Sequence, residues 1–149
     1  MSPKLALLAC LSSTLFMTGV IWFVQVVHYP LFSRVEVGSF RRYHEAHTRT
    51  TTYVVVLPMV VELLAGVYLV WHRPEGVDPW MAWLGLGAAL VSWGVTFFLS
   101  VPAHNRLAGG FDPEAHRDLV RTNAIRAAFQ SRGKAQGRPL KQEDFDELF

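Results

Sequence analysis

The chain has 149 residues, of which 51% are hydrophobic and only 17% are charged, and its formal net charge is +2. The length suits one domain, and the charged fraction lies below the ~25% that is usual in soluble domains. The single cysteine, Cys10, excludes an internal disulfide framework and a zinc-thiolate cluster within one chain.

Three segments predict membrane-spanning helices, because each offers the ~20 mostly apolar residues that a bilayer requires. They cover about residues 5–28, 51–71 and 80–102. In the third segment, six small residues are expected to let neighbouring helix backbones approach closely: Gly85, Gly87, Ala88, Ala89, Ser92 and Gly94. The longest stretches without a charged residue, 5–33 and 79–105, agree with this assignment.

The segment at about 113–132 predicts a fourth, amphipathic helix at the membrane interface. It begins with Asp112 as the N-cap, Pro113 in the first helical position and Glu114 in the first turn. Its expected apolar face, which Arg126 interrupts, consists of Ala115, Leu119, Thr122, Ile125 and Phe129. Residues 1–132 therefore predict one all-α helical bundle in the membrane, and residues 133–149 a mobile polar tail.

Basic residues alternate across the predicted spans. One lies before the first span, four lie in the 29–50 loop, one lies in the 72–79 loop and eight follow the third span. The positive-inside rule then places the N-terminus outside the cell membrane, and the 29–50 loop and the C-terminal tail in the cytoplasm. Arg41 and Arg42 are expected to meet anionic lipid headgroups or an anionic ligand. No nucleic-acid partner is expected.

The first span carries a polar stripe that is expected to face other helices rather than lipid. Its members share one helical face: Cys10, Thr14, Thr18, Gln25 and His28. Gln25 is one turn from His28 and is expected to hold one imidazole nitrogen or to bond across helices.

Four histidines gather at the predicted cytoplasmic boundary: His28, His44, His47 and His104. The stretch 39–50 contains no helix breaker, so we expect a helix that starts near Ser39, carries His44 and His47 on one face and continues into the second span. Clustered imidazoles suit Fe, Cu, Zn or haem iron, although H-x-x-H alone is a weak signal. The alternative is a set of interfacial histidines with single hydrogen bonds.

Glu62 lies near the middle of the second span, where a charged carboxylate costs ~2.5–3.5 kcal/mol. It is therefore expected to face the bundle interior, to be paired or to be protonated. Along a straight helix it lies roughly 22 Å from His47, so the two side chains cannot share one metal ion.

Two stretches resemble a family of small bacterial membrane proteins and, more distantly, the anthrone-oxygenase-like family. They are HYPLF…FRRYHEAHTRT…PMVVEL, at 28–63, and VPAHNRLAGGFD…HRDLVRTNAIR, at 101–126. The resemblance implies a membrane bundle of about four helices and the oxidation of polycyclic anthrones to quinones by molecular oxygen. It implies no established cofactor. The matching positions are His28, Tyr43, His44, His47, Glu62, His104, Asn105, Asn123 and Arg126.

Together these patterns predict a small membrane enzyme that oxidises a hydrophobic aromatic or quinone-like molecule. His28, Tyr43 and Glu62 are the candidate catalytic residues, and the four clustered histidines are the candidate metal ligands. Arg41, Arg42, Gln25 and Asn105 are the candidate ligand- or lipid-binding residues. Two alternatives stay open: a non-enzymatic accessory or lipid-binding subunit, and a carrier of protons or small solutes that acts as a homo-oligomer.

Overall fold

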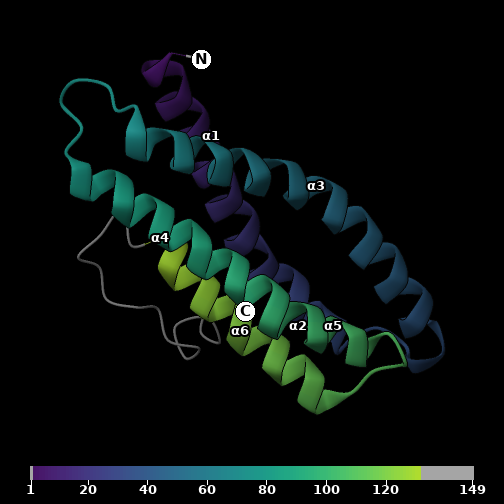
Figure 1. Cartoon of the computed structure of the whole chain (residues 1–149). Coiled ribbons are helices and arrows are strands. Elements are labelled where there is room, and N and C mark those ends of the chain that lie inside the picture. The colour runs from purple at the N-terminus through teal and green to yellow at the C-terminus, as the bar shows by residue number, and fades with distance from the viewer. Residues whose placement is uncertain (1, 132–149) are drawn as a thin grey trace.

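The computed structural model describes residues 2–131, and all the regular structure in that range is helical (Figure 1). In chain order the elements are α1 (Pro3–Phe23), the π-helical turn η1 (Val24–His28), α2 (Tyr29–Phe32), α3 (Val37–Trp71), α4 (Pro79–Val95), the π-helical turn η2 (Thr96–Ser100), α5 (Val101–Leu107) and α6 (Pro113–Ser131). The predicted tail at 133–149 lies outside the described residues.

Three continuous helical segments are long and apolar enough to cross a membrane: Pro3–Phe32, Val37–Trp71 and Pro79–Leu107. The all-α bundle with three such helices is therefore confirmed. The first and third segments run further than predicted, because the chain keeps helical backbone angles through Pro30 and Pro102 and the helix does not end there. A π-helical turn precedes each of these prolines, and such turns are frequent at functional sites.

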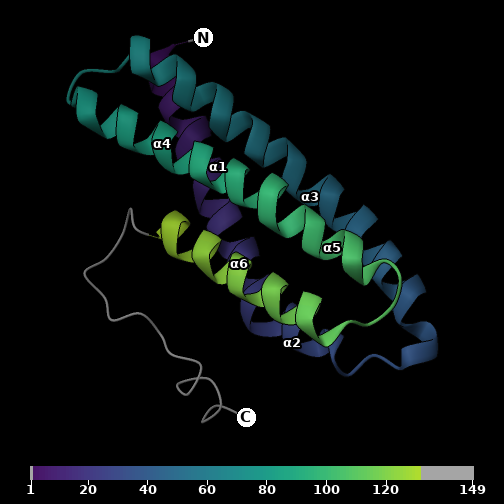
Figure 2. The ribbon, with the colours of Figure 1, turned by 60° about the horizontal axis from the view of Figure 1, so that its bottom comes forward.

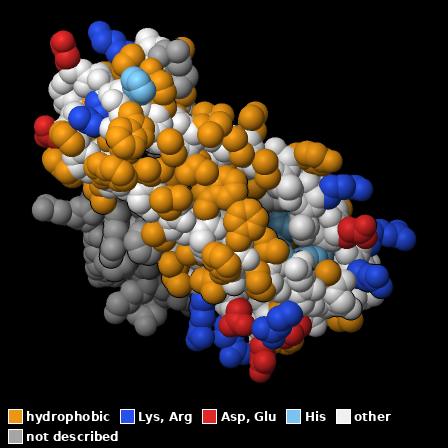
Figure 3. All heavy atoms as spheres, in the orientation of Figure 1, with side chains coloured by type: hydrophobic (Ala, Val, Ile, Leu, Met, Phe, Trp, Pro, Cys, Tyr) orange, Lys and Arg blue, Asp and Glu red, His pale blue; other side chains and the backbone are white. Residues whose placement is uncertain are grey.

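The surface of the three apolar segments is largely hydrophobic. Figure 3 shows orange side chains between charged groups that gather mainly towards two ends of the molecule. Several large hydrophobic side chains are mostly exposed, among them Phe98 at 80% and Tyr53 at 79%. Contiguous apolar surface on this scale marks a protein that lies against lipid or another apolar partner.

The helices form a ring of four neighbours. α3 packs against α1 and α4, and α6 packs against the same two helices from the other side. α6 runs lengthwise along the bundle beside α4 and α5, rather than lying across its end (Figures 1 and 2). The interfacial helix that the sequence predicts is thus the fourth wall of the bundle.

The buried face of α6 differs from the predicted one. Ile125 is 45% exposed, whereas Arg126 is buried and Asn123 is buried three residues before it. Arg126 therefore belongs to the inward face and does not interrupt it. The predicted helix start is confirmed, since Asp112 Oδ1 accepts hydrogen bonds from the backbone N–H groups of Glu114 and Ala115. These bonds, with Arg106 nearby, hold the pKa of Asp112 below its usual value.

The predicted packing role of the small α4 residues holds for Ala89 and Ser92, which are buried, but not for the three glycines within the described chain. A Cβ atom added at Gly85, Gly87 or Gly94 would meet no other atom within 4 Å. The close approach instead involves Gly66 of α3, where an added Cβ would lie 3.7 Å from the Leu86 side chain.

Candidate functional site: two histidine pairs and an apolar groove

The helix that carries two of the histidines starts where the sequence predicts. α3 begins at Val37, two residues before Ser39, and continues without interruption to Trp71. His44 and His47 therefore lie one turn apart on its first third. His28 ends η1 and His104 lies in α5, so the chain brings the four imidazoles together from three parts of the sequence.

His28 and His47 form one hydrogen-bonded pair. His28 Nε2 lies 2.7 Å from His47 Nδ1, and the Thr51 hydroxyl lies 3.1 Å from the same His47 atom. Two tautomer patterns satisfy this geometry, with the N–H on either His28 Nε2 or His47 Nδ1. Within the described residues, Nε2 of His47 carries no hydrogen bond, so it is free for a ligand.

His44 and His104 form a second pair, which a buried tyrosine extends. His44 Nε2 lies 3.1 Å from His104 Nδ1, and the Tyr29 hydroxyl lies 3.2 Å from His104 Nε2. His44 and Tyr29 are only 2% and 6% exposed. We refer to Tyr29, His104 and His44 as the buried string, because both ring nitrogens of His104 are engaged within it.

Phe32 packs against both groups, which also meet directly, since the ring centroids of His47 and His104 lie 5.8 Å apart. Its side chain is fully buried, and its ring centroid lies 5.1 Å from that of His47 and 6.0 Å from that of His44. Both contacts are edge-to-face, an arrangement that adds to the stability gained from burial. The imidazoles therefore pack against the apolar Phe32 ring and do not surround an empty space.

α6 closes the far side of the site. His116 Nε2 lies 2.8 Å from the backbone oxygen of Tyr29, which falls in the last turn of a helix and would otherwise be unpaired. Asn123, further along α6, donates to Gln25 Oε1 at 2.9 Å and to the Ile21 oxygen at 3.3 Å. Of the two roles expected for Gln25, the structure thus shows the bond across helices.

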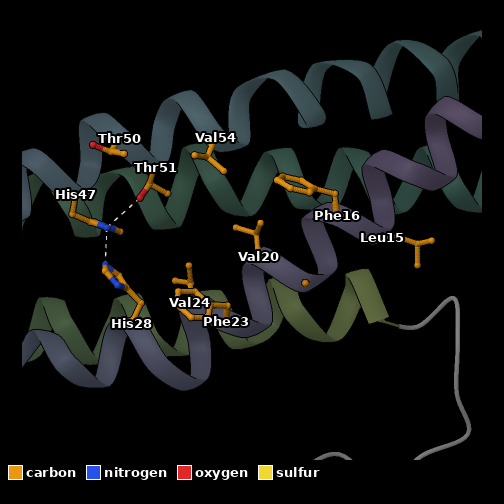
Figure 4. A pocket seen from close by; sticks show the side chains of 11 residues that line it. Leu15, Phe16, Val20, Phe23, Val24, His28, His47, Thr50, Thr51 and Val54 are labelled. Atoms are coloured by element: carbon orange, nitrogen blue, oxygen red, sulfur yellow. Dashed lines mark hydrogen bonds between the residues drawn. The ribbon is translucent and has the colours of Figure 1, made fainter.

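An open groove of about 560 Å³ leads from the His28–His47 pair along α1 and α3. Its polar lining is confined to four side chains: His28, His47, Thr50 and Thr51. The rest of the lining is apolar: Leu15, Phe16, Gly19, Val20, Phe23, Val24 and Val54. Figure 4 shows the two imidazoles facing one another at one end, with the apolar side chains extending away from them along the two helices.

Glu62 faces the bundle interior, as the sequence predicts. It is 7% exposed, and its Oε1 accepts a hydrogen bond from the Thr14 hydroxyl at 2.6 Å. The Cys10 thiol lies 4.0 Å from the Glu62 backbone oxygen. The polar stripe of α1 therefore meets α3, and Glu62 belongs to a layer that is separate from the histidines.

Arg126 lies between the two layers. It is 8% exposed, its Nη2 donates to the Met59 sulfur at 3.2 Å, and its Nε has no partner among the described residues. Burial lowers the pKa of Arg126, while the charges of Tyr29 and Glu62 act in the opposite direction. One guanidinium is thus buried against Met59 of α3, one turn before Glu62.

The four histidines do not form a joint ligand set. Among the described residues, no group of three or more His, Cys, Asp or Glu side chains is arranged to hold a metal ion. The physical reason is the pairing itself. Each imidazole has one ring nitrogen hydrogen-bonded to its neighbour, and His104 has both ring nitrogens hydrogen-bonded. The hypothesis of a metal held by all four residues therefore gains no support.

The other predicted residues lie at the rim or on the outside. Tyr43 is 37% exposed and stacks on His28 with ring centroids 6.2 Å apart. Arg41, Arg42 and Asn105 are exposed. Arg106 of α5 pairs with Asp112 and Asp118 at 3.1 Å each.

Sequence reasoning missed Tyr29 and Phe32 as parts of the site. Both lie in the quoted HYPLF stretch, but their burial depends on Pro30 continuing the helix, which an interior proline normally prevents. The groove was also missed, because it forms only where α1 and α3 lie together. Comparison with known proteins finds no matching family model, curated protein or solved structure.

Proposed function

We propose that the protein is an integral membrane enzyme that takes a hydrophobic aromatic or quinone-like molecule from the lipid and exchanges a proton with it at His28–His47. The observation that carries this proposal is the groove itself, apolar along its length and closed at one end by a hydrogen-bonded imidazole pair. Ligand sites of this kind combine an apolar lining with a few polar groups that fix orientation.

The pair supplies acid–base chemistry. Imidazole titrates near neutral pH, and a second imidazole bonded to it can accept or return the charge that a proton transfer creates. His47 Nε2 is the atom that exchanges the proton, His28 orients and polarises His47, and Tyr43 flanks His28.

Oxidation of an anthrone-type ring is the reaction that this arrangement would serve. Proton loss from the ring CH₂ carbon to the imidazole leaves an electron-rich carbanion that reduces molecular oxygen. The carbon loses two hydrogens and gains one oxygen as a carbonyl, and the second oxygen leaves as water. Glu62 is not among the groove-lining residues, so it takes no part in this step.

Oxygen uptake tests the proposal, with the full chain in lipid nanodiscs and anthrone as the probe. Wild type is expected to consume one O₂ per ring oxidised, and His47→Gln to lower the rate ~100-fold or more, the usual contribution of a general base. His72→Gln, an exposed histidine that lies outside the groove lining, is the matched control and is expected to leave the rate unchanged. A rate that does not depend on His47 contradicts the proposal.

A proton or small-solute carrier is a second candidate, favoured by the buried Glu62–Thr14 contact in the middle of the bundle. Intramembrane carboxylates recur in proton pathways. Proton flux into liposomes that is lost in Glu62→Gln would favour this candidate, and flux that survives the substitution would count against it. In either case we place the chain in the cell membrane with its N-terminus outside, on the distribution of basic residues.

A further inference from the structure

The groove is longer than a ring system needs. From His28 back to Leu15 the lining follows α1 for thirteen residues, roughly 20 Å at 1.5 Å per residue. All four polar lining residues lie at one end. A ligand that matches this distribution has a small polar head and a long apolar chain.

The polar end suits a neutral head. It offers two imidazoles and two threonine hydroxyls, and no Lys or Arg lines the groove. Phosphate recognition relies on Arg, Lys or helix N-termini, and none of these lines the groove. A ring carbonyl or hydroxyl is matched by the imidazole N–H and nitrogen groups, whereas a phospholipid headgroup would leave its charge unpaired.

The apolar end leaves room for a chain. Gly19 lies in the lining, and a Cβ atom added there would meet nothing within 4 Å. Phe16 and Val20 lie on either side of it along α1, and Val54 belongs to the facing helix (Figure 4). A branched, flexible hydrocarbon can follow such a surface from the membrane boundary towards the bilayer centre.

We propose that the groove binds an isoprenoid quinone or quinol, with the ring at His28–His47 and the isoprenoid chain along α1 over Gly19. This inference rests on the proposed function: the quinone ring stands for the oxidised head that the site binds, and the isoprenoid chain is added to it. The chain leaves lipid rather than water when it binds, so its contribution comes from packing and not from the hydrophobic effect. A modest gain of about tenfold in affinity is expected.

The test compares two ligands with three variants. The ligands are a benzoquinone with a three-unit isoprenoid chain and the same ring with a methyl group in place of the chain. Their binding is measured by titration calorimetry on the full chain in nanodiscs of fixed lipid composition. Gly19→Leu fills the chain-binding half, His47→Gln removes the head contact, and Gly87→Leu adds the same side chain at an open site on α4.

We expect wild type to bind the long-chain quinone about tenfold more tightly than the methyl analogue. Gly19→Leu is expected to remove that advantage and leave the methyl analogue unchanged, His47→Gln to weaken both, and Gly87→Leu to weaken neither. Equal affinity of wild type for the two quinones, or no effect of Gly19→Leu, overturns the inference.

The outcomes separate this inference from the proposed function. If the methyl analogue binds in a His47-dependent way and the chain adds no affinity, the proposed function stands and the inference of an isoprenoid chain is overturned. If neither quinone binds, or if binding does not depend on His47, both the proposed function and this inference are overturned. A co-purified phospholipid that Gly19→Leu expels and the long-chain quinone cannot displace identifies a lipid acyl chain as the occupant and overturns the inference.

Discussion

The two histidine pairs have the same chemistry and opposite surroundings. His28 and His47 line an open groove, whereas His44 and His104 lie in the buried string with Tyr29. His44 and His47 are separated by only three residues of one helix. The two imidazoles share one face of α3, so their surroundings differ because of their partners: His44 meets His104 of α5, and His47 meets His28 at the end of η1. We propose that identical residue types thus divide between a structural role and a ligand-binding role.

The largest effect is expected from Phe32→Ala, which removes a ring that contacts both histidine pairs. The ring is fully buried and contacts His28, His47 and His44. Its loss should lower the free energy of unfolding by ~3–5 kcal/mol, as for other buried phenylalanines. Denaturation in detergent, followed by near-UV circular dichroism, measures the change.

Phe98→Ala is the control for this prediction, since Phe98 is 80% exposed. It is expected to change the stability little. A loss below about 1 kcal/mol in Phe32→Ala would mean that the ring does not form the common base of the two pairs.

An intermediate effect is expected from Glu62→Gln, which tests whether the deeper layer is independent of the groove. The amide keeps a hydrogen bond to Thr14 but removes the carboxyl group, whose charge would offset that of the buried Arg126. A buried cation that loses its compensating charge should cost ~1–3 kcal/mol of stability, and binding at the groove should not change.

Replacing the cation as well sharpens this prediction. In the Glu62→Gln background, Arg126→Met is expected to recover most of the lost stability, because it removes the uncompensated charge. A double-mutant cycle measures the coupling. Strictly additive effects would show that Arg126 and Glu62 do not interact.

The smallest effect is expected from Arg41→Gln combined with Arg42→Gln. Both side chains are exposed and neither lines the groove. The free energy of unfolding should change by no more than about 0.5 kcal/mol, as for other surface substitutions. Ligand affinity should also be unchanged. Weaker association with anionic vesicles is the one expected loss, and weakened groove binding would instead place these arginines in the site.

Much of the architecture could be predicted from the sequence, because charge-free stretches and helix-start residues act locally. The three apolar helices, the start of α3 and the Asp112 cap all follow from a few neighbouring residues. The inward orientation of Glu62 follows from the cost of leaving a carboxylate in lipid.

The site was only partly predictable. The sequence predicted that four histidines gather at one end of the bundle. It did not predict their pairing, because the pairing depends on the π-helical turns before Pro30 and Pro102. The inward position of Arg126 depends on α6 lying along α4 and α1, a long-range contact that no local pattern encodes. The groove likewise appears only where α1 and α3 are placed together.

The central claim is that the His28–His47 pair binds a ligand while the buried string supports the fold. Quinone binding and unfolding stability, measured together in His47→Gln and His44→Gln, test it most directly, because the two positions are three residues apart on α3. The account predicts that His47→Gln weakens binding by about tenfold or more with little loss of stability. It also predicts that His44→Gln lowers stability with little change in binding. Equal effects of the two substitutions on binding, or the reverse pattern, would contradict it.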